Sequence, residues 1–127
     1  MNVLVIEDDV LFNKMLCSHL LNEGYTVTSA KNGHQAIHLI ENNLVVDAVV
    51  CDIFMPGSSG PTFALMLKRH YKNNLPLIIL MSAKSHGEEF LKSLNIPFNH
   101  FITKPFQFNN LVLLLQQHQQ KKLNFHI

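Results

Sequence analysis

The sequence predicts an α/β fold, with five parallel strands in one sheet and helices on both of its faces. Three observations support this fold class. Short apolar runs alternate along the chain with segments whose apolar residues have helical spacing. The runs that begin at Ala48 and Leu77 are almost continuously apolar, as strands buried on both faces are. Polar side chains follow directly after several of these runs, where the carboxyl ends of the strands would lie.

The composition is that of one globular domain. Of the 127 residues, 47% are hydrophobic and 15% are charged, which favours a packed core over disorder. The formal charge of +1 argues against direct nucleic-acid binding. No apolar run approaches the roughly 20 residues of a membrane span, and Glu7 follows the first apolar run too soon for a signal peptide. Two cysteines without metal-type spacing predict reduced thiols and a cytoplasmic location.

The first half of the chain is expected to contain three strands and two helices. The strands are predicted over residues 3–6, 25–29 and 48–51, the second of them at an edge of the sheet. Asp9 is predicted to cap the first helix and Gly24 to end it. Its apolar face is expected to hold Phe12, Met15, Leu16, His19 and Leu20. A second helix over 34–42 would bury Ala36, Ile37 and Ile40 and leave His34 and His38 in solvent.

The second half is expected to hold three helices and two strands. A third helix begins at Gly60-Pro61, since a proline in the first turn loses no helical hydrogen bond. Its inner face is predicted to hold Phe63, Met66, Leu67 and His70. The run 77–81 is the most apolar and is predicted to be a central strand. A short helix over 88–94, a strand over 101–103 and a helix from about 107 complete the pattern. The last helix would bury Phe108, Leu111, Leu114, Leu115 and His118.

Four of the predicted strands end in polar side chains. These are Glu7-Asp8, Asp52, Ser82 and Lys104, in chain order. In a parallel sheet all of them reach the same edge. Three carboxylates and one ammonium leave a net charge of about −2, which must raise carboxylate pKa values or recruit a divalent cation. Mg²⁺ suits such a site, because it takes one or two carboxylates and leaves room for a phosphate oxygen. With a hydroxyl and a lysine nearby, Asp52 could act as a nucleophile that forms an acyl phosphate.

On these residues, the chain resembles the receiver domain of two-component response regulators over nearly its whole length. The resemblance rests on four segments: Glu7-Asp8, Cys51-Asp52-Ile53-Phe54-Met55-Pro56-Gly57, Met81-Ser82-Ala83 and Thr103-Lys104-Pro105-Phe106. Each segment alone is weakly specific, but the four in this order and at these intervals are strongly specific. The resemblance implies a flavodoxin-like (βα)5 three-layer sandwich with strand order 2-1-3-4-5.

The resemblance also implies a role for each site residue. Asp52 would accept a phosphoryl group from a phosphohistidine of a histidine kinase or a histidine phosphotransfer protein. Mg²⁺ would be held by Asp8, Asp52 and the carbonyl oxygen of Phe54, with Glu7 acting through water. Residues that would bind the phosphoryl group or switch with it are Ser82, Ala83, Phe101 and Lys104. Catalysis would be limited to self-phosphotransfer and slow autodephosphorylation.

Further expectations concern domain limits and partners. We expect a receiver domain over 1–120, and a tail or the start of a linker over 121–127. The partners implied are the phosphodonor protein and a downstream effector, with neither nucleic acid nor membrane contacted directly. The face made by the fourth helix, fifth strand and fifth helix is a candidate homodimer surface. The sequence departs from many relatives at Asn95-Ile96-Pro97-Phe98 before the last strand, and at Phe101, which lacks a tyrosine hydroxyl.

Two other functions remain open from the sequence. One is a receiver-like interaction module that works without phosphorylation. The other is an aspartate-based phosphatase, which is disfavoured because such enzymes resemble Asp-x-Asp at the nucleophile and position 54 is Phe. Cys51 is expected to point to the opposite face of its strand from Asp52, into the core.

Overall fold

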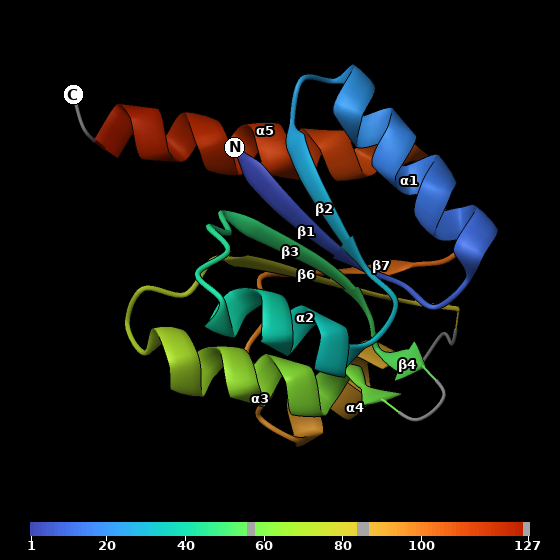
Figure 1. Ribbon diagram of the computed structural model, residues 1–127, viewed down its shortest axis with the longest axis vertical. Coiled ribbons are helices and arrows are strands. Elements are labelled where there is room, and N and C mark those ends of the chain that lie inside the picture. The colour runs from blue at the N-terminus through green and yellow to red at the C-terminus, as the bar shows by residue number, and fades with distance from the viewer. Residues whose placement is uncertain (56–57, 84–86, 126–127) are drawn as a thin grey trace.

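Five parallel strands form the central sheet, in the order β2-β1-β3-β6-β7 (Figure 1). They are β1 (Asn2–Ile6), β2 (Thr26–Ala30), β3 (Ala48–Asp52), β6 (Leu77–Ser82) and β7 (His100–Thr103). This computed structural model describes residues 1–55, 58–83 and 87–125. Because β6 and β7 are the fourth and fifth strands of the sheet, the predicted order 2-1-3-4-5 is confirmed. The second strand lies at an edge, also as predicted.

Helices cover both faces of the sheet and make the fold a three-layer sandwich (Figure 1). One face is covered by α1 (Val10–Asn22) and α5 (Phe108–Phe125). The other is covered by α2 (Gly33–Glu41), α3 (Gly60–Tyr71) and α4 (Gly87–Ser93). A short antiparallel hairpin, β4 (Phe54–Met55) and β5 (Ser58–Ser59), precedes α3 and was not expected from the sequence.

Two apolar cores result from the alternation of side chains along the strands. In β1, Val3 and Val5 pack toward α1 and α5, whereas Leu4 and Ile6 pack toward α2 and α3. Every residue of β3 is buried, which explains the unbroken apolar run from Ala48 to Cys51. Cys51 belongs to the core on the α2 side, as predicted. Each fully buried aliphatic side chain of this kind contributes about 1.5–3 kcal/mol relative to exposure.

The helices begin close to the predicted residues, but parts of their predicted inner faces are wrong. Met15 of α1 is 50% exposed, and Asn13 is buried with Leu16 and Leu20 instead. In α3, Met66 and His70 are exposed and Ala64 is buried. In α5, Val112 is buried while Leu114 and His118 are only half-buried. Apolar spacing leaves the rotation of a helix uncertain by about one residue, or roughly 100°.

Local interactions explain where α1 begins and ends. The side chain of Asp9 accepts a hydrogen bond from the backbone N–H of Phe12 at 2.9 Å, which confirms the predicted helix cap. Gly24 follows the end of α1 with a φ of +95°, a conformation that favours glycine. At the other end of the chain, α5 continues to Phe125, so the described part of the expected tail over 121–127 is helical. The division at 120 stays a prediction.

The loop that enters β7 contains the departure at Asn95-Ile96-Pro97-Phe98. Ile96 is buried and belongs to the core on the α4 side. The loop is also tied to β6, because Asn99 donates its backbone N–H to Ile78 O at 2.8 Å and accepts from Ile78 N at 2.7 Å through its side chain. The changed sequence is therefore accommodated without loss of the strand pairing between β6 and β7.

No helix in the described part of the chain is both long and apolar enough to span a lipid bilayer.

Candidate functional site

Asp52 is the last residue of β3, which lies between β1 and β6 in the middle of the sheet. Its side chain is buried at the carboxyl edge, with 7% of the residue exposed. One carboxylate oxygen, Oδ1, accepts a hydrogen bond from the backbone N–H of Phe54 at 3.0 Å. The other, Oδ2, accepts one from Nζ of Lys104 at 2.7 Å. The Asp52 carboxylate is therefore fixed by hydrogen bonds and is not a solvated strand end.

Glu7 follows β1 directly and is 1% exposed. Its Oε1 forms an ion pair with Lys104, and its Oε2 accepts from the backbone N–H of Asp9 at 3.2 Å. Burial raises the pKa of Glu7 above its ordinary value, and the opposing effect of Lys104 does not cancel this. The nearby carboxylates of Asp8 and Asp52 raise the pKa further.

Asp8 completes an acidic cluster at this edge. One carboxylate oxygen from each of Glu7, Asp8 and Asp52 lies within 4.8 Å of the other two. Asp8 is exposed, whereas the other two are buried, so the cluster is open to solvent on the side of Asp8. A set of oxygen donors with one open side suits a hard divalent cation that keeps some of its water ligands.

Lys104 follows β7 and reaches both buried acids. Its backbone N–H donates to Ser82 O at 2.8 Å, which extends the pairing of β6 and β7 by one residue. Its side chain is 17% exposed, and Nζ also lies 4.5 Å from the ring centroid of Phe12. Burial lowers the pKa of Lys104, but its bonds to Asp52 and Glu7 outweigh burial and raise that pKa overall. Lys104 therefore stays protonated at neutral pH.

The predicted switch residues lie around this cluster. Ser82 ends β6 beside Asp52 and is buried, whereas Ala83 after it is exposed. Phe101 lies in β7 and is half-buried. The ring of Phe54 is part of the exposed surface and stacks on Phe90 of α4, with ring centroids 6.2 Å apart. The structure thus brings the three acids, Ser82 and Lys104 to the carboxyl edge, whereas Phe101 lies three residues before Lys104 in β7.

Two supporting residues were missed in the sequence. Buried Asn13 donates from its side chain to Glu7 O at 2.9 Å and to Ala30 O at 3.3 Å, and so fixes the end of β1 against β2. Phe12 places its ring under Lys104 and packs edge-on against Phe106. A signal for Asn13 did exist, because it lies three and seven residues before the buried leucines of α1.

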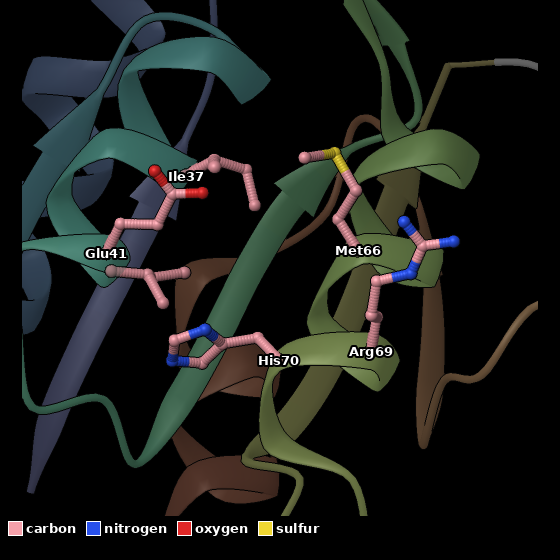
Figure 2. A pocket seen from close by; sticks show the side chains of 6 residues that line it. Ile37, Glu41, Met66, Arg69 and His70 are labelled. Atoms are coloured by element: carbon pink, nitrogen blue, oxygen red, sulfur yellow. The ribbon is translucent and has the colours of Figure 1, made fainter.

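A hollow of about 240 Å³ lies elsewhere, between α2 and α3. Its lining residues are Ile37, Ile40, Glu41, Met66, Arg69 and His70. Figure 2 shows the carboxylate of Glu41 on one side and the side chains of Arg69 and His70 on the other. None of the clustered acids contributes to this lining. Chemical groups, and not this concavity, therefore identify the candidate site.

Comparisons with known proteins agree with this geometry. The sequence profile of the response regulator receiver domain matches residues 3–116. Response regulator RR06 of Streptococcus pneumoniae is 30% identical, over 92% of this chain and 51% of its own length. An uncharacterised transcriptional regulatory protein of Bacillus subtilis, YrkP, is 34% identical, over 82% of this chain and 43% of its own. The chain thus spans about half the length of the curated relatives it matches.

Solved structures are similar over nearly the whole chain. The response regulator TrrA from Thermotoga maritima, in complex with Mg(2+)-BeF, has a TM-score of 0.80 and 30% identity, covering 92% of this chain and 97% of that one. The receiver domain of the Francisella response regulator 1452 has a TM-score of 0.83 and 26% identity, covering 95% and 98%.

Proposed function

Because this chain belongs to the response regulator receiver domain family of two-component systems, we propose that it accepts a phosphoryl group on Asp52 and passes this change to a partner. The phosphodonor is a phosphohistidine of a histidine kinase or of a histidine phosphotransfer protein. The observation that carries the proposal is the position of Lys104, whose ammonium binds Asp52 from β3 and Glu7 from β1 at once.

The reaction is an in-line transfer between two side chains. An oxygen of the Asp52 carboxylate attacks phosphorus, so that an O–P bond forms while the N–P bond of the phosphohistidine breaks. The leaving imidazole keeps the electron pair of the broken bond. Attack by water on the acyl phosphate later releases inorganic phosphate and restores the carboxylate. The chain modifies only itself in this scheme and is not a turnover enzyme.

The environment of Asp52 supports its role as the nucleophile. Its two oxygens accept hydrogen bonds from the backbone N–H of Phe54 and from Lys104, which fix the position of the carboxylate. The ammonium of Lys104 can move from this carboxylate to a phosphoryl oxygen, where its positive charge offsets the added negative charge. Ser82, buried at the end of the neighbouring strand, is the proposed second donor to the phosphoryl group.

We propose Mg²⁺ as the cofactor, held by Asp8, Asp52 and the carbonyl oxygen of Phe54, with Glu7 acting through water. The clustered oxygens of the three acids fit a hard cation. Bound there, Mg²⁺ would offset the negative charge of the carboxylates and of the transferred phosphoryl group. The buried acids supply fixed negative charge, and Asp8 stays accessible at the open side of the cluster.

The output is a change of surface. A dianion on Asp52 interacts differently with Ser82 and Lys104 than the carboxylate does, and such a difference is what shifts a conformational equilibrium. Ala83 follows Ser82, and Phe101 precedes Lys104 by three residues, so these two are the proposed relay to α4, β7 and α5. That face is the proposed contact for a downstream effector or a second copy. The two free cysteines support a reducing, cytoplasmic location.

The decisive experiment uses a small phosphodonor. The protein is incubated with acetyl phosphate and Mg²⁺ and its intact mass is measured. We expect one phosphoryl adduct in the wild type, none in Asp52→Asn, and loss of the adduct when Mg²⁺ is removed with a chelator. Asp47→Asn is the matched control, since Asp47 lies at the opposite edge of the sheet and should leave the adduct unchanged. No adduct with any phosphodonor would favour the phosphorylation-independent interaction module instead.

A further inference from the structure

Gly87, the first residue of α4, is buried against an aromatic ring from β7. A Cβ atom built on Gly87 would lie 2.8 Å from Cζ and 3.1 Å from Cε2 of Phe101. It would also lie 3.1 Å from Cδ1 of Ile53. Real Cβ atoms essentially never approach another heavy atom within 3.0 Å. Any side chain at position 87 therefore requires the ring of Phe101 or the start of α4 to move.

Backbone conformation does not explain a glycine at this position. The φ angle of Gly87 lies outside the left-handed range, so another residue could adopt it. Alanine would also favour the helix more than glycine does. What position 87 supplies is space, and the ring of Phe101 fills it.

We infer that Gly87 is a positioning residue: its missing side chain forms a seat for the Phe101 ring, and the seated ring couples α4 to the Asp52 site. This inference rests on the proposed function for the coupling, but not for the seat itself. It assigns a role to a residue outside the four segments on which the family resemblance rests.

The seat lies between segments that lead to three of the site residues. Ile53, on one side of it, follows Asp52 directly. Phe101, on the other, precedes Lys104 by three residues in the same strand and its extension. Gly87 itself begins α4, five residues after Ser82. A side chain in the seat would therefore press on the Phe101 ring and on the start of α4, which lie close in the chain to the proposed phosphoryl-binding ammonium and hydroxyl.

The direction of the coupling follows from the groups that are already in place. With the ring seated, Lys104 bonds to Asp52 and Ser82 is buried beside it. The seated ring is thus found together with a site in which Lys104 and Ser82 both lie beside Asp52. Unseating the ring is expected to loosen these donors and to weaken the binding of a phosphoryl group.

A double-mutant cycle tests the seat. Leucine lacks the Cε and Cζ atoms that contact position 87, so Phe101→Leu removes the clash while position 101 stays apolar. Gly87→Ala alone is expected to raise the unfolding equilibrium constant about tenfold through overpacking. In the Phe101→Leu background it should change that constant by less than about twofold, because the helical preference of alanine offsets the remaining contact with Ile53. Equal effects in both backgrounds would overturn the seat.

Nuclear Overhauser effects test the same point without a mutation. In the wild type, the Hα protons of Gly87 are expected to show effects to the ring protons of Phe101. Their absence would overturn the seat, whatever the stability cycle shows.

The coupling is tested with beryllofluoride, a phosphoryl mimic, in the presence of Mg²⁺. We expect Gly87→Ala to weaken beryllofluoride binding about tenfold, and the double variant to bind within about threefold of Phe101→Leu alone, the interaction of contacting residues being non-additive. Glu88→Ala, an exposed change in the next residue of α4, is the control and should leave affinity unchanged. If Gly87→Ala lowers stability but leaves beryllofluoride affinity unchanged, the seat contributes only to packing and the coupling is overturned.

Failure of this inference can be told apart from failure of the proposed function. If the wild type binds no beryllofluoride with Mg²⁺, the proposed function fails and the coupling fails with it. The Overhauser effects and the stability cycle still decide the seat in that case. If the wild type binds and the cycle is additive, only this inference fails.

Discussion

Oppositely charged side chains meet at both edges of the sheet, but they are buried at the carboxyl edge and exposed at the amino edge. At the carboxyl edge, the side chain of Lys104 is 17% exposed, and those of Glu7 and Asp52 are 1% and 10% exposed. At the amino edge, Lys122 of α5 lies 3.9 Å from Asp47, and their side chains are 56% and 33% exposed. The same kind of pair is thus placed in two different environments.

The acid at the amino edge serves the backbone. The side chain of Asp47 accepts from the backbone N–H of Asn2 at 2.6 Å, and its main chain bonds to Asn2 and Leu77. It therefore joins the starts of β1, β3 and β6. At the carboxyl edge, the buried acids instead share one lysine, and desolvation makes this arrangement costly unless every charge stays paired. The contrast teaches that the acid of the amino edge joins strand ends in partial contact with solvent, whereas the carboxyl edge holds buried charges that depend on one lysine.

The largest expected effect comes from removing the shared lysine. Lys104→Met leaves Glu7 and Asp52 buried without their cation, and such losses destabilise by about 3–5 kcal/mol. Urea unfolding at neutral pH without Mg²⁺ measures this. Added Mg²⁺ is expected to recover part of the loss, because the acidic cluster then holds another cation. A Lys104→Met protein as stable as the wild type would contradict the comparison of the two edges.

The cost of Lys104→Met should also depend on pH. Burial already raises the pKa of Glu7, and removing the ammonium raises it further. A folded-state carboxyl with a raised pKa binds its proton more tightly than the unfolded chain does, so its contribution to stability is lost as pH rises. The difference in unfolding free energy between variant and wild type is therefore expected to shrink as pH falls toward 4.5, the ordinary pKa of the group.

A smaller effect is expected from the support of the carboxyl edge. Asn13→Ala leaves the carbonyl oxygens of Glu7 and Ala30 without the buried amide that donates to both. Ala30 O keeps the backbone N–H of Glu7 at 3.1 Å, so the main loss is the buried donor to Glu7 O, and a loss of this kind costs about 1–3 kcal/mol. Urea unfolding gives the stability change, and Mg²⁺ affinity should fall as well, because the main chain at Glu7 loses its hydrogen bond from Asn13. Loss of stability without loss of Mg²⁺ affinity would show that Asn13 supports the fold and not the cluster.

At the amino edge, Asp47→Ala is expected to cost about 1 kcal/mol, the typical net contribution of one hydrogen bond, here from Asn2 N. Chemical denaturation provides the value. Because Asp47 lies at the far end of β3, phosphorylation by acetyl phosphate should not change. A change in phosphorylation would mean that the two edges are not independent.

The smallest effect is expected from Lys122→Met. The pair with Asp47 is exposed and long, and such pairs contribute roughly 0–1 kcal/mol. The contrast with Lys104→Met, an identical substitution, isolates burial as the cause of the difference. A cost for Lys122→Met near that for Lys104→Met would remove the distinction between the edges.

The sequence was informative about the sheet and its carboxyl edge for a physical reason. Parallel strands place their last residues at one edge, so Glu7, Asp52 and Ser82 could be brought together from their positions in the chain alone. Asp9 was predictable because helix capping is local. Strand order required the family resemblance, since apolar spacing does not say which strands are neighbours.

Contacts between distant segments could not be predicted in the same way. Whether Phe12 lies under Lys104, or whether a ring fills the space at Gly87, depends on how helices pack on the finished sheet. The exposure of Met15 and Met66 had the same origin, because apolar spacing does not fix the rotation of a helix on the core. Residues that act through packing were therefore missed, while those that act through strand position were found.

Cys51 is next to the proposed phosphoryl acceptor and is completely buried in the core. Burial raises the pKa of its thiol far above the usual range, so a maleimide can alkylate it only during transient opening of β3. Cys17, on α1, is half-buried and provides a second site in the same molecule. The rate of Cys51 alkylation thus reports how often the middle of the sheet opens, and no reporter residue has to be introduced.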